Sequence, residues 1–130
     1  MQNPITPQLG SHLILEVWNA KNLENEDYIR NVLIEMTEAA GATLLKIFLH
    51  HFGEGFGVTG VAVLAESHIS IHTWPEHNYA AIDVFMCGDA DVNKTIPVVK
   101  ASFSTESVDV TTFPRGILDS SRVADVEALV

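Results

Sequence analysis

Three strand-like segments follow one another in the middle of the chain, and this feature restricts the fold more than any other. Residues 58–64, 68–73 and 79–86 are apolar or alternate between apolar and polar residues, as β-strands do. One helix-like segment lies on each side of this group of strands. The pattern therefore predicts an α+β fold, with a mainly antiparallel sheet and helices packed on one face.

The flanking segments supply the helices and the rest of the sheet. Apolar residues over 26–40 recur at helical spacing, with Asn25 able to cap the start and Gly41 able to end the helix. A second helix should begin just before Pro97, because proline is tolerated in a first turn. We expect an irregular lead-in over 1–10, and little regular structure from Pro114 onward apart from a loose helix over 123–130. The remaining expected strands are 12–18, 43–52 and 107–113.

No linker, repeat or low-complexity run divides the chain, so we expect one domain over residues 1–130. No apolar run approaches the ~20 residues that a membrane helix needs, and the first residues do not resemble a secretory signal. The single cysteine cannot form an internal disulfide, and a free thiol fits a reducing compartment. These features predict a cytoplasmic protein.

The chain is strongly acidic, with 17 acidic against 7 basic residues and a formal net charge of −10. Nucleic acids and anionic membranes are poor partners for such a chain, because clustered Lys and Arg bind them. A negative field steers small cations toward a protein. We therefore expect a small cationic substrate, although an acidity that serves only solubility would give the same charge.

Residues 65–77 bring together groups that covalent chemistry uses. Ser67 follows Glu66, His72 lies five residues further on, and the only cysteine, Cys87, lies twenty residues after Ser67. A nucleophile, a base and a thiol are the parts of a covalent mechanism. By spacing alone, the same residues fit equally well a hairpin whose histidines face the solvent.

Two runs in this region carry a family resemblance: Glu-Ser-His-Ile-Ser-Ile-His-Thr-Trp-Pro-Glu and, after it, Tyr-Ala-Ala-Ile-Asp-Val-Phe-Met-Cys-Gly. Together they resemble the short prokaryotic S-adenosylmethionine decarboxylases, which are self-processing pyruvoyl enzymes. The resemblance is dense over 58–88, and the segments that also fit outside it are Gly10, His12, Gly41-Ala42 and Pro114-Arg115-Gly116. It implies a two-layer α/β sandwich. It also implies a pyruvoyl-dependent carboxy-lyase, most simply one that acts on S-adenosylmethionine and supplies aminopropyl groups for spermidine synthesis.

The resemblance further implies that the chain makes its own prosthetic group. Ser67 Oγ would attack the carbonyl carbon of Glu66 and turn the amide into an ester. β-Elimination and hydrolysis would then leave a β chain, 1–66, and an α chain, 67–130, that begins with pyruvoyl. Decarboxylation needs such an electron sink because the carbanion it leaves is unstable. We expect no metal ion, and no pyridoxal phosphate because no lysine sits beside a glycine-rich phosphate loop.

The resemblance implies roles for five residues. Ser67 is the pyruvoyl precursor, and His72 resembles the base of the processing reaction. Thr59 stands where relatives carry serine, a hydroxyl that helps the ester to form. Cys87 resembles the proton donor to the carbanion, and Glu76 resembles the carboxylate that holds the ribose hydroxyls. In the family, two protomers complete one site, which implies a homodimer or a larger assembly: Ser67 and Cys87 come from one protomer, and Thr59, His72 and Glu76 from the other.

The loop after Phe52 leaves the substrate open. Relatives commonly carry a proline-containing segment where this chain has Gly53-Glu54-Gly55-Phe56. Phe52 or Phe56 could stack on adenine or face a sulfonium. Glu54 would instead pair with the distal cation of ornithine or arginine. The same chemistry on ornithine or arginine is therefore one alternative, and an unprocessed, inactive homologue that acts as a binding or regulatory subunit is another.

Overall fold

Six strands form one antiparallel sheet in the order β2-β3-β4-β5-β1-β6 in the computed structural model, which describes residues 7–119. The strands are β1 (Gln8–Val17), β2 (Leu44–His51), β3 (Val58–Leu64), β4 (Ser67–Trp74), β5 (Tyr79–Cys87) and β6 (Val108–Ile117). The helices are α1 (Glu26–Ala40) and α2 (Thr95–Ser102), with the short 3-10 turns η1 (Pro75–His77) and η2 (Val92–Lys94).

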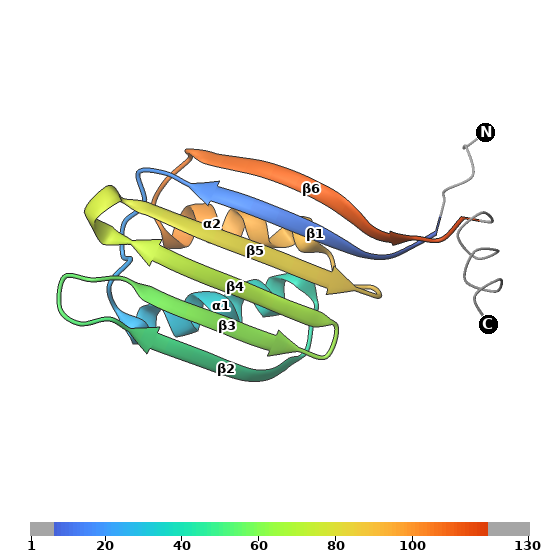
Figure 1. The fold of residues 1–130 in the computed structure, drawn as a ribbon, viewed down its shortest axis with the longest axis horizontal. Helices are drawn as coiled ribbons and strands as arrows, with labels where there is room; N and C mark the ends of the chain where they lie inside the picture. Colours follow the sequence, from blue (N-terminus) through green and yellow to red (C-terminus); the bar gives the residue numbers. More distant parts are fainter. Residues whose placement is uncertain (1–6, 120–130) are drawn as a thin grey trace, which may run out of the picture.

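Both α-helices cover the same face of this sheet, and Figure 1 looks onto the opposite face with the helices behind it. Every second residue of β5 is buried, from Ala80 to Met86, because the strand turns alternate side chains toward the helices. These residues form one core with apolar residues of α1 such as Leu33. The predicted two-layer sandwich with a mainly antiparallel sheet is confirmed. The face that carries no helix is called the open face below.

Helix α1 has the predicted bounds, and its ends show why. The side chain of Asn25 accepts a hydrogen bond from the backbone N–H of Tyr28, at the start of the helix. Gly41 adopts a left-handed conformation with φ 74° and donates its N–H to a carbonyl of the last turn. Neither α-helix of the described residues is long and apolar enough to cross a membrane.

Two strand predictions were wrong at their ends. The first strand begins at Gln8 rather than at residue 12, so the predicted irregular lead-in is too long. The last strand continues to Ile117, although little regular structure was expected from Pro114 onward. Proline is tolerated in an edge strand, and β6 is the edge strand that pairs with β1 alone. The helix predicted over 123–130 lies outside the described residues.

Candidate active site

The Glu66–Ser67 peptide bond lies where the two-residue turn between β3 and β4 passes into β4. The carbonyl oxygen of Glu66 accepts two hydrogen bonds from Cys87. The backbone N–H of Cys87 donates at 3.1 Å, and its thiol donates at 2.9 Å. Two donors on one carbonyl oxygen stabilise negative charge that develops on that oxygen when a nucleophile attacks the carbon.

The backbone at Ser67 is unusual. Its φ of 155° lies at the edge of the positive region that residues with a side chain rarely adopt. Such strain concentrates at functional sites when the surrounding structure imposes it. Here the flanking pairing of β4 with β3 and β5, Leu64 with Ser67 and Ser67 with Met86, fixes the strand on both sides.

A second group of predicted residues lies at the other end of β3 and β4. Thr59 and His72 are direct cross-strand partners, and Thr59 Oγ1 lies 3.0 Å from His72 Nδ1. This contact orients the imidazole and leaves its other ring nitrogen available for a proton transfer. The pair therefore has the geometry of a hydroxyl and a base that act together.

A hollow of about 310 Å³ adjoins this pair. It gathers most of the predicted substrate-binding residues, and its lining consists of Phe52, Phe56, Gly57, Thr59, His72, Thr73, Trp74 and Glu76. Trp74 and Gly57 in this lining are not among the site residues that the sequence predicts. A side chain at Gly57 would collide with the backbone carbonyl of Thr73, so glycine lets the loop close onto β4.

Glu54 lies apart from that hollow. It borders a different one, together with other acidic residues at the start of α1 and with His51. The two loop phenylalanines therefore face one hollow, while the carboxylate between them in sequence faces another.

The two groups of residues are far apart within one chain. Ser67 and His72 are the first and sixth residues of the same strand, β4. Five steps along an extended strand cover about 17 Å at ~3.3 Å per residue. A base must come within about 3 Å of the proton it removes, so His72 cannot reach Ser67 of its own chain.

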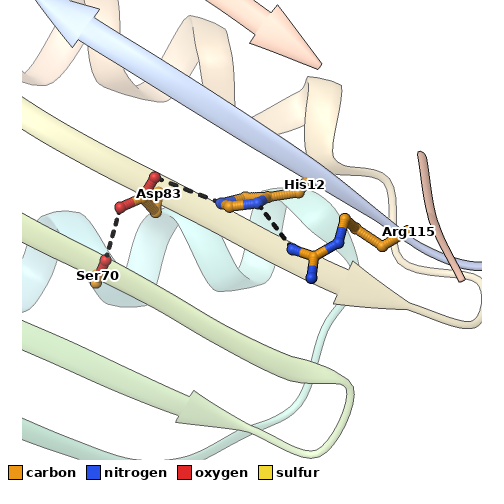
Figure 2. A network of polar contacts seen from close by, with 4 residues as sticks. All are labelled: His12, Ser70, Asp83 and Arg115. Atoms are coloured by element: carbon orange, nitrogen blue, oxygen red, sulfur yellow. Dashed lines mark hydrogen bonds and ion pairs between the residues drawn. The ribbon is translucent and has the colours of Figure 1, made fainter. Parts of the chain in front are cut away.

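A polar network occupies the open face between these two ends, and Figure 2 shows its four side chains. Ser70 donates to Asp83 Oδ2 at 3.4 Å, and His12 Nε2 lies 3.4 Å from Asp83 Oδ1. Arg115 Nη1 lies 3.3 Å from His12 Nδ1. Because arginine can only donate, Nδ1 of His12 is the acceptor of that contact, and Nε2 faces Asp83. The network thus joins four strands and contains one arginine and one aspartate.

Tyr79 is held beside the same end of the sheet as His72. Its ring lies between Trp18 and Trp74, with centroid distances of 4.5 and 5.4 Å, and its hydroxyl donates to Glu16 at 2.8 Å. Burial, with the neighbouring Glu16 carboxylate, raises the pKa of Tyr79 to about 12. Tyr79 therefore stays protonated and neutral at physiological pH.

Comparison with known proteins identifies the family of the chain. The family described as S-adenosylmethionine decarboxylase matches residues 11–116. A protein of Methanococcus maripaludis (strain C5) named S-adenosylmethionine decarboxylase proenzyme is 46% identical over 121 residues, covering 91% of this chain and 98% of that protein. A protein of the same name from Synechococcus sp. (strain WH7803) is 53% identical over 83 residues, 62% of this chain and 64% of that protein.

The crystal structure of the adenosylmethionine decarboxylase from Aquifex aeolicus VF5 superimposes with a TM-score of 0.77 and 30% identity, covering 87% of this chain and 95% of that one. The fold and these matches show that the chain is a carboxy-lyase of the kind made as a proenzyme. Within that class, the chain belongs to the S-adenosylmethionine decarboxylase family, in its prokaryotic form. The resemblance found in the sequence is therefore confirmed.

Proposed function

We propose that this chain is a proenzyme that cleaves itself between Glu66 and Ser67 and then decarboxylates S-adenosylmethionine for spermidine synthesis. The observation that carries the proposal is the pair of hydrogen bonds from Cys87 to the Glu66 carbonyl, at the bond that has to break. Family membership supports the same activity. One cysteine in the whole chain is compatible with activity in the cytoplasm.

Self-cleavage proceeds in two stages. Ser67 Oγ attacks the carbonyl carbon of Glu66, the C–N bond breaks, and the hydroxyl proton moves to the released nitrogen, which leaves an ester. Cys87 holds the charge on the carbonyl oxygen during this step. A base then removes the α-proton of residue 67, the Cβ–O bond breaks, and Glu66 departs as a carboxylate. The dehydroalanine that remains tautomerises and exchanges its nitrogen for water, which releases ammonia.

The residues at the junction fit a pyruvoyl group at position 67, because the backbone of the serine itself is strained and two donors face the carbonyl before it. Such a group supplies the electron sink that decarboxylation needs. Cleavage removes the Glu66 carbonyl from its peptide bond and frees the Cys87 thiol. That thiol is then the proton donor to the substrate carbon that has lost its carboxylate.

The base that removes the α-proton comes from a second copy of the chain. His72 lies about 17 Å along β4 from Ser67 of its own chain, at ~3.3 Å per residue. Two copies that stack open face to open face about a two-fold axis near Ser70 would set Ser67 and Cys87 of one beside Thr59 and His72 of the partner subunit. Such stacking would also bury the polar network of Figure 2. We therefore propose a homodimer with two shared sites.

The hollow next to His72 fits S-adenosylmethionine better than a basic amino acid. Phe52, Phe56 and Trp74 present aromatic faces for adenine and the sulfonium. Glu76 borders the same hollow and can accept two hydrogen bonds from ribose hydroxyls. Ornithine or arginine would need a carboxylate for the distal cation, and Glu54 lies outside this hollow.

Denaturing gels, with intact-mass measurement of the separated chains, test the self-cleavage, and substrate assays test the decarboxylation. Purified wild-type protein should separate into chains 1–66 and 67–130 on denaturing gels, while Ser67→Ala should remain one chain. Carbon dioxide release should occur from S-adenosylmethionine and not from ornithine or arginine. A wild-type protein that stays intact under all conditions would contradict the enzyme and favour an inactive binding subunit. Release from ornithine or arginine alone would contradict only the substrate.

A further inference from the structure

We propose that Thr43 and the side-chain carboxylate of Glu66 form a positioning pair for self-cleavage, which holds the scissile carbonyl against Cys87. This inference rests on the proposed self-cleavage and adds a residue to it. Thr43 lies 23 residues before Glu66 and immediately precedes β2. Nothing in the sequence pattern connects the two.

Three hydrogen bonds join Thr43 to the turn that contains the scissile bond. The backbone N–H of Thr43 donates to Glu66 Oε1 at 2.8 Å, and its hydroxyl donates to Oε2 at 3.3 Å. In the opposite direction, the backbone N–H of Ala65 donates to the carbonyl of Thr43 at 2.9 Å. Both carboxylate oxygens of Glu66 are therefore occupied by the same residue.

These contacts fix Glu66 from two sides. Its side chain is tied to the residue before β2, while its carbonyl is tied to Cys87 at the end of β5. Held at both points, the peptide unit after Glu66 has little freedom to rotate. The carbonyl then stays on its two donors. Fixing a reacting group in this way lowers the entropic part of the barrier.

The arrangement also separates a positioning role from a catalytic one. A carboxylate next to Ser67 could in principle act as the base that removes its hydroxyl proton. Here both oxygens accept from Thr43 instead. Glutamine keeps this geometry, because its oxygen can accept from the Thr43 N–H and its amide can donate to the Thr43 hydroxyl. A base would be lost in Glu66→Gln, whereas the positioning contact would survive.

The experiment follows cleavage of full-length chains made by cell-free synthesis, sampled over time on denaturing gels. Glu66→Ala should slow cleavage about 10- to 100-fold, because it removes charge-assisted hydrogen bonds. Glu66→Gln should slow it by at most about fivefold. Thr43→Val should slow cleavage about two- to tenfold, because the backbone donor remains, and Thr43→Ser should restore most of the rate. Thr112→Val, an exposed threonine of β6, is the matched control.

Two further measurements sharpen the result. The double variant Thr43→Val with Glu66→Ala should be no slower than Glu66→Ala alone, because both changes break the same contact. Thermal unfolding of each variant, made on a Ser67→Ala background that cannot cleave, shows whether the fold is intact. If Glu66→Ala fails to fold, Glu66→Gln and the two Thr43 variants still decide the question.

The outcomes are distinguishable. If the wild type cleaves itself and Glu66→Ala or Thr43→Val cleaves at the same rate, the positioning pair is refuted and the proposed function stands. Glu66→Gln as slow as Glu66→Ala would also overturn it, since the carboxylate would then act as a base. A wild-type chain that never cleaves would remove the proposed function, and this inference with it.

Discussion

Co-expression of two inactive variants gives a direct test of the shared site. Ser67→Ala lacks the nucleophile and His72→Ala lacks the base, so neither homodimer should mature. In a heterodimer, however, one site combines Ser67 of the His72→Ala chain with His72 of the Ser67→Ala chain. Cleavage of the His72→Ala chain should therefore return only when the two chains assemble together.

The size of the effect follows from the geometry. Along the backbone of β4 the two residues are about 17 Å apart at ~3.3 Å per residue, whereas proton transfer needs a contact of about 3 Å. A lost general base costs about 10²- to 10⁴-fold, so each homodimer should show almost no cleavage. A purified heterodimer has one complete site of two and should reach about half of the wild-type turnover per dimer.

Distinct affinity tags on the two variants allow the heterodimer to be isolated by two successive columns. Gels then show which tagged chain is cleaved, and carbon dioxide release gives the turnover. The control is a pair of differently tagged His72→Ala chains. If the heterodimer stays uncleaved while wild-type chains with the same tags mature, the shared site is refuted. If the His72→Ala homodimer matures by itself, another group is the base, and His68, next to Ser67, would be the first to examine.

Cys87→Ala should slow self-cleavage about 10- to 100-fold, because it removes a donor from the Glu66 carbonyl. The fraction that is cleaved should lose most of its decarboxylase turnover. Denaturing gels measure the first effect and carbon dioxide release measures the second. Glu76→Gln should raise the KM for S-adenosylmethionine about 10-fold or more, whereas Glu54→Gln should change it less than about twofold; equal effects would refute the assignment of the hollow. Because the pKa of folded Tyr79 is raised from 10.0 to about 12, its contribution to the free energy of unfolding is complete below pH 10 and is lost as the pH rises toward 12. Denaturant unfolding should therefore show a steeper alkaline loss in wild type than in Tyr79→Phe, and identical slopes would count against it.

The sheet and its helical layer could be predicted from the sequence, because period-two and helical patterns report directly on which side chains are buried. Helix α1 was predicted to the residue, since a capping Asn25 and a left-handed Gly41 mark both ends. The extension of β6 through Pro114 was missed, because the sequence does not show which strand will lie at the edge of the sheet.

The family resemblance divides the candidate residues into the same two groups that the structure shows, Cys87 with the Glu66–Ser67 junction and Thr59 with His72 and Glu76, whereas spacing alone does not. Ser67 and His72 are neighbours in a motif, yet an extended strand carries them to opposite ends of the sheet. Glu54 is next to Phe52 and Phe56 in sequence, but the loop turns it toward another hollow. Thr43 could not be found at all, since only the pairing of β2 with β3 brings it to the turn before Ser67.

The separation of Ser67 and His72 along one strand has a consequence for timing in the cell. On the proposed mechanism, a newly made chain holds its own imidazole out of reach of the intact junction, so the folding of one chain would not start maturation. Maturation would begin only when two chains meet, and at low abundance its rate would rise with the square of the chain concentration. Chains at low concentration would then persist as uncleaved precursor.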